Sequence, residues 1–153
     1  MFNEIITNNV LIIPICSWAI AQVIKVIIIL VWKKKLDLRL LFFSGGMPSS
    51  HSAFVTALAT SVALIEGLGS VAFGISAIFT LVVIYDATGV RRSAGQQSVI
   101  LNRIIREFRV RRPVTELGQD LREFIGHTQL QVVIGALIGI VVAWSWLIVA
   151  GAQ

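Results

Sequence analysis

The chain has 153 residues, 56% of them hydrophobic, and a mean hydropathy of +0.86. These values exclude an ordinary soluble domain and indicate a membrane protein with a few spanning helices. The formal net charge is +5, but apart from Lys25 every lysine and arginine falls in two stretches, 33–39 and 91–122. That asymmetry is typical of cytoplasmic loops between membrane helices, so we expect no nucleic-acid partner.

The predicted fold class is all-α, an integral membrane bundle of about four transmembrane helices plus a cytoplasmic amphipathic helix. We expect one domain, 1–153, with helices over about 10–32, 48–66, 70–86 and 128–150 and cytoplasmic loops over 33–47 and 87–127. The first helix is long enough to cross a bilayer with some tilt. The tight turn "EGLG" joins the second and third segments and predicts an antiparallel helical hairpin.

The basic loops predict the orientation, because cytoplasmic loops carry the excess of lysine and arginine. The turn at Glu66 then lies outside, while His51, Asp86 and His127 all lie at the cytoplasmic face. We therefore expect an integral protein of a bacterial-type inner membrane with its active site at that face.

The stretch 96–109 predicts the amphipathic helix. Ile100, Ile104 and Phe108 recur at a spacing of four, and arginines repeat on another side. This pattern is typical of a basic helix that lies on an anionic leaflet. A helix packed against its own protein explains the pattern equally well.

The stretch "SGGMPSSHSA", residues 44–53, is a polar, glycine-rich interruption before the second helix. Glycines let a ligand approach the backbone closely, and the N–H groups at a helix start bind phosphate. Gly46, Ser49 and Ser50 therefore predict a site for an anion, with the His51 imidazole at its edge. The alternative is a capped helix start that binds no ligand.

Two patterns of small residues predict close helix packing. Ser52, Thr56 and Thr60 share one face of the second helix, and Gly135 and Gly139 form a GxxxG pattern in the fourth. Both are typical of helix interfaces within membranes.

Four charged side chains are candidates for the site. Asp86 ends the third helix, where a carboxylate is costly unless it is paired or hydrated. Arg91 and Arg92 are its natural partners, and they can either clamp a phosphate by forked hydrogen bonds or anchor the helix to lipid headgroups. Lys25 lies about two turns inside the first helix, where it either extends to the interface or points into the site.

The only two histidines, His51 and His127, both lie at predicted cytoplasmic helix starts, which favours a shared site. Gln131 is four residues after His127, on the same helical face, so it can orient the imidazole by a hydrogen bond. The histidines and Asp86 lack a close metal-ligand spacing, and we expect no metal and no other cofactor.

The segments "GGMPSSHSA", "YDATGVRRSAGQQ" and "LREFIGHT" resemble the divergent branch of the type 2 phosphatidic acid phosphatases, over about residues 10–143. The resemblance implies metal-free phosphatase chemistry through a phosphohistidine. It implies that His127 is the nucleophile and His51 the general acid. It also makes Ser49, the Ser50 backbone and Arg122 phosphate ligands.

The chain departs from the family pattern at several positions. Ser50 replaces the glycine of the second motif, Leu121 the serine of the third, and Gln131 its aspartate; Arg122 precedes His127 by one residue too few. No segment matches the first motif, so Lys25, Arg91 and Arg92 are candidates for the missing charge. The carboxylates that are candidates to replace the aspartate are Asp86, Glu116, Asp120 and Glu123.

The sequence therefore predicts a membrane-embedded hydrolase of a phospholipid or isoprenoid phosphomonoester. The departures leave a second function open, a non-catalytic phospholipid or anion-binding protein on a degenerate phosphatase scaffold. We also expect a homo-oligomer, because four thin helices enclose little volume.

Overall fold

The computed structural model describes residues 4, 7–33, 46–90, 93, 95–101, 103–104 and 127–151. Its elements are α2 (Asn9–Lys33), α3 (Ser50–Glu66), α4 (Val71–Tyr85), the π-helix η2 (Asp86–Val90) and α6 (Gln129–Gly151). The described parts of the chain contain helices and turns but no strand. The protein is therefore an all-α bundle, as predicted.

Within the described part of the chain, three segments are long and apolar enough to cross a membrane: Asn9–Trp32, Val71–Leu101, which contains α4, and Gln129–Ala150. α3 has 17 residues, fewer than the roughly 20 that a typical span needs. Residues 96–101 and 103–104, within the predicted amphipathic segment, are helical, and Ile100 and Ile104 are exposed.

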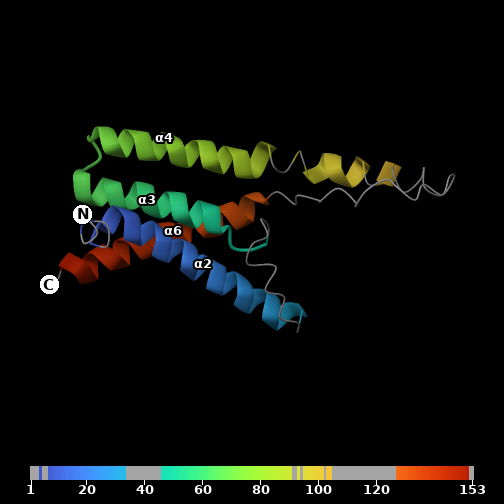
Figure 1. Ribbon diagram of the computed structural model, residues 1–153, viewed down its shortest axis with the longest axis horizontal. Coiled ribbons are helices and arrows are strands. Elements are labelled where there is room, and N and C mark those ends of the chain that lie inside the picture. The colour runs from blue at the N-terminus through green and yellow to red at the C-terminus, as the bar shows by residue number, and fades with distance from the viewer. Residues whose placement is uncertain are drawn as a thin grey trace.

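α3 is the central helix of the bundle. α4 lies along one side of α3, while α2 and α6 cross on the other side (Figure 1). The turn 67–70 reverses the chain between α3 and α4, which form the expected hairpin. Gly67 permits this turn because its φ of 86° lies in a region that other residues rarely adopt.

α3 and α6 pack closely because two glycines on α6 leave room for the α3 backbone. A Cβ atom at Gly135 would overlap the Ser49 carbonyl, and one at Gly139 would lie 2.8 Å from Ala57 N. Thr56 Oγ1 lies 2.6 Å from its intrahelical acceptor Ser52 O, and 3.2 Å from Ala136 O on α6. The packing that the GxxxG pattern predicted is confirmed.

Hydroxyl groups also link α3 to its other neighbours. Ser17 Oγ on α2 donates to Ala53 O at 3.1 Å, and Thr80 Oγ1 on α4 lies 2.9 Å from Val55 O. Bulky apolar side chains on α2, α4 and α6 point outward instead. Small and polar residues inside, with large apolar residues outside, are the arrangement of a bundle surrounded by lipid.

Candidate functional site

The candidate site lies at the end of the bundle where α3 and α6 begin and where α4 continues into η2 (Figure 1). The Ser49 N–H donates to Gln131 O at 3.0 Å, which links the starts of α3 and α6. The His127 N–H donates to Ala87 O at 3.3 Å, which links the residues before α6 to η2. Two helix N-termini therefore meet at one end, and their partial positive charges favour an anion there.

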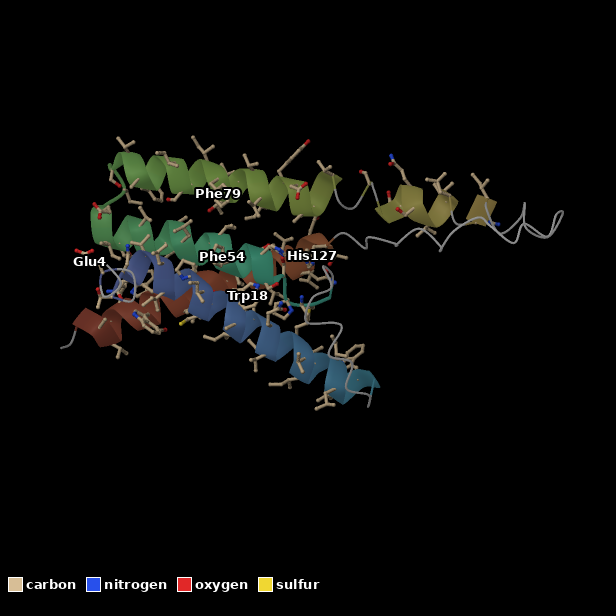
Figure 2. The ribbon with its side chains drawn as sticks, in the orientation of Figure 1. Glu4, Trp18, Phe54, Phe79 and His127 are labelled. Carbon is tan, nitrogen blue, oxygen red and sulfur yellow. The ribbon has the colours of Figure 1, made fainter. Side chains whose placement is uncertain are left out.

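His127 lies at this end, beside the first turns of α3 and α6 (Figure 2). It is 4% exposed, and its Nδ1 lies 3.2 Å from Gln131 Oε1. The predicted hydrogen bond between these two side chains is confirmed. The same Oε1 accepts the Thr128 N–H at 3.1 Å, and the Gln131 N–H donates to Thr128 Oγ1 at 3.4 Å. Together these two bonds form a capping box at the start of α6.

Ser49 is the N-cap of α3. Its Oγ accepts the Ser52 hydroxyl at 2.9 Å and the Ser52 N–H at 3.4 Å. Because its own N–H is bonded to Gln131 O, the group that Ser49 retains for an anion is its hydroxyl hydrogen. Ser50 follows in the first turn of α3, where N–H groups have no acceptor within the helix.

Side-chain exposure differs along the first turn of α3. Ser49 and Ser50 are buried, whereas the His51 side chain is exposed. The serines therefore face the protein interior near Gln131, while His51 lies on the accessible side of the same turn.

Lys25 is buried beside the loop that leads into α3. It is 2% exposed, so its side chain is enclosed by the protein. A Cβ atom on Gly46 would lie 3.9 Å from Lys25 Cγ and Cδ, so the Gly46 backbone runs along the lysine stem. Among the residues that the structure describes, no side chain forms a hydrogen bond or ion pair with Lys25.

Asp86 begins η2 and is partly exposed, one residue before the carbonyl that accepts the His127 N–H. π-helical turns are rare and frequently occur at functional sites. The predicted ligands Arg91, Arg92 and Arg122 lie outside the described residues. Within the described ranges, no group of three His, Cys, Asp or Glu side chains lies close enough to hold a metal ion.

Sequence reasoning missed two parts of this site. Thr128 and Gln131 form the T-x-x-Q pattern of a capping box, which the sequence did contain. The role of Ala87 has no sequence signal, because His127 bonds to its backbone carbonyl, a group that every residue carries.

A groove lined by described residues lies elsewhere. It has a volume of about 500 Å³ between α2 and α6, away from His127, and its lining residues are Ile20, Val141, Val142, Ser145, Trp146, Val149 and Ala150. Its walls are mainly apolar, which suits an acyl chain better than a phosphate.

Comparison with known proteins decides the family. The sequence matches the Divergent PAP2 family over residues 6–142. The chain belongs to this family. It is also 42% identical over 146 residues to the "Uncharacterized membrane protein YuiD" of Bacillus subtilis (strain 168), an alignment that covers 90% of this chain and 92% of that protein. No solved structure matches the sequence. The resemblance in the three segments is thus confirmed, and the scaffold is phosphatase-related.

Proposed function

We propose that the protein hydrolyses a lipid phosphomonoester through a phosphohistidine on His127, without a metal. One observation carries the proposal. The buried His127 is held by Gln131 and by the Ala87 carbonyl at the end where α3 and α6 begin. A fixed imidazole beside two helix N-termini combines a nucleophile with a site for an anion.

The reaction would proceed in two steps. His127 Nε2 attacks phosphorus, so an N–P bond forms while the P–O bond to the lipid alcohol breaks. His51 gives its proton to the leaving oxygen and then accepts a proton from the water that cleaves the N–P bond. Phosphate is released and both histidines return to their starting states.

Several donors would hold the phosphoryl oxygens: Gly46, Ser49, Ser50, Lys25, Arg91, Arg92 and Arg122. Donors aimed at charge that develops in the transition state typically contribute about 2.7–4 kcal/mol each. Asp86, close in sequence to the carbonyl that holds His127, is the carboxylate we assign to balancing positive charge during the reaction.

The substrate would be a phospholipid or an isoprenoid phosphate in a bacterial-type inner membrane, with its phosphate at the cytoplasmic face. The basic stretches 33–39 and 91–122 support this orientation. A cysteine at Leu68, 72% exposed in the turn between α3 and α4, in a Cys16→Ser background should react with an impermeant reagent added outside intact cells. A cysteine at Ser93, exposed beyond η2, should react only after lysis, and the opposite pattern would invert the topology.

A second function is favoured by a specific observation. Gln131 is neutral where a carboxylate would stabilise a charged imidazole, and the Ser49 N–H is engaged by the fold. A site with these properties suits a protein that binds a phospholipid headgroup without turnover.

Phosphate release separates the two functions. The purified protein is offered phosphatidic acid, lysophosphatidic acid and isoprenoid monophosphates, and released phosphate is measured for wild type, His51→Ala and His127→Ala. Leu68→Ala, at the opposite end of the bundle, is the matched control. We expect release that both histidine variants abolish and the control retains. If the wild type binds these lipids but releases phosphate from none of them, the result would contradict hydrolysis and support the binding function.

A further inference from the structure

Gln131 Oε1 lies between two groups at the start of α6. It accepts the Thr128 N–H at 3.1 Å and lies 3.2 Å from His127 Nδ1. A backbone N–H can only donate, so the side-chain atom that faces Thr128 is the amide oxygen and not the amide nitrogen. An amide oxygen has no hydrogen to give, so Nδ1 must donate in its bond with Gln131.

We propose that Gln131 is a positioning residue that holds His127 in the Nδ1–H tautomer and places the lone pair of the neutral ring on Nε2. The hydrogen bond at one ring nitrogen determines which nitrogen carries the proton. A neutral histidine in water favours the proton on Nε2, so the structure imposes the less common tautomer. The catalytic meaning of this assignment rests on the proposed function, in which Nε2 is the atom that attacks phosphorus.

Both partners of this bond are fixed by other contacts. Gln131 is held in the first turn of α6, because its N–H donates to Thr128 Oγ1 while its side chain returns to the Thr128 N–H. His127 is held by its own N–H on Ala87 O and by burial of its ring. The bond therefore does not require two free side chains to meet, and little rotamer entropy is lost in forming it.

The neutral acceptor distinguishes this site from one with a carboxylate. An amide oxygen orients a neutral imidazole but does not offset the positive charge of a protonated or phosphorylated ring. Glutamate serves equally well at this position of a capping box. Gln131→Glu therefore changes the charge beside Nδ1 and retains the geometry, whereas Gln131→Leu removes the acceptor.

Because the chain contains only two histidines, the tautomer of His127 can be measured directly. The full chain is labelled with ¹⁵N-histidine and studied by NMR in detergent at about pH 8, above the ordinary imidazole pKa of about 6.5. His51→Gln removes one of the two ring systems and assigns the other to His127. We expect a protonated Nδ1 and an unprotonated Nε2 in His127, and the opposite tautomer in Gln131→Leu.

Gln131→Glu keeps an acceptor oxygen beside Nδ1 and should show the same Nδ1–H signal as the wild type. This variant and the wild type still test the assignment if Gln131→Leu fails to fold. Thr128→Ser, which retains the capping hydroxyl, is the matched control and should give the wild-type spectrum. A wild-type His127 protonated at Nε2, whether alone or together with Nδ1, would overturn the assignment. An Nδ1–H signal that survives in folded Gln131→Leu would also overturn it.

Phosphate release by the same samples separates this inference from the proposed function. An Nδ1–H tautomer in a protein that releases no phosphate would contradict the proposed function and support the tautomer. Phosphate release from a protein with the Nε2–H tautomer would contradict the role assigned to Gln131 and leave the phosphatase in place.

Discussion

α3 and α4 are consecutive helices joined by one turn, yet their surroundings are opposite. α3 contacts three other helices and buries Ser50, Ser52, Ala53, Val55, Thr56, Ala57, Ser61 and Val62. In α4, which the structure describes throughout, the buried side chains are Ser76 and Thr80, while the bulky residues point outward. Small and polar residues therefore mark protein contacts in this bundle, and large apolar residues mark lipid contacts.

The largest expected effect comes from replacing a glycine at the α3–α6 contact. Gly139→Leu would place a side chain against Thr56, Ala53 O and Ala57 N, which are held by backbone structure. Overpacking of a close contact typically costs 1–3 kcal/mol or more, and here the two helices must separate. We expect loss of the folded, monodisperse protein in detergent, measured by size-exclusion chromatography and thermal unfolding.

Gly74→Leu on α4 is the matched control, because a side chain at Gly74 meets no atom within 4 Å. It should leave the elution volume and the unfolding temperature unchanged. Equal damage from both substitutions would contradict the contrast between α3 and α4.

Substitutions on α2 show whether its buried polar face and its exposed apolar face differ in the same way. Lys25→Met removes a buried charge with little change in volume, and a lysine within the bilayer costs roughly 2.5–3.5 kcal/mol. We expect a more stable protein with at least about tenfold weaker vanadate binding, equivalent to about 1.4 kcal/mol. Thermal unfolding and calorimetric titration with orthovanadate measure the two effects.

Val23→Met, on the exposed face of α2, is the control and should change neither quantity. Unchanged vanadate affinity in Lys25→Met would remove Lys25 from the phosphate ligands. A loss of stability in that variant would show that the lysine supports the fold instead.

The smallest expected effect concerns the hydroxyl that joins α4 to α3. Thr80→Val removes a hydroxyl that lies 2.8 Å from Ser76 O on its own helix and 2.9 Å from Val55 O on α3, and interhelical bonds in membranes contribute about 0.6 kcal/mol on average. Thr88→Val is the control, since Thr88 Oγ1 lies 2.9 Å from Ile84 O, an acceptor on its own stretch of chain. A small fall in unfolding temperature should appear in Thr80→Val alone, and a larger fall in Thr88→Val would contradict the account.

The sequence predicted the parts of the structure that depend on local signals. Apolar runs between basic loops predicted helices within two residues of 9–33, 50–66, 71–85 and 129–151. The GxxxG pattern predicted close helix packing, which the structure places between α3 and α6, and the spacing of His127 and Gln131 predicted their hydrogen bond. Each of these signals lies within a short stretch of sequence.

The remaining features depend on contacts between distant segments. The sequence left open whether Lys25 extends to the interface, because the answer depends on the Gly46 loop that covers its stem. The bond from Ser49 N–H to Gln131 O has no sequence pattern either, since it joins two backbones. The sequence therefore identified the candidate residues. It did not show which of their N–H and O–H groups already form hydrogen bonds within the fold.

The central claim is that His127 carries the phosphoryl group, and trapping of that group tests it most directly. Wild-type protein turning over a lipid phosphate is quenched in alkali, in which phosphohistidine survives, and its peptides are analysed by mass spectrometry. We predict phosphate on His127 and on no other residue, and none in His127→Ala. Sustained phosphate release by His127→Ala would contradict the account.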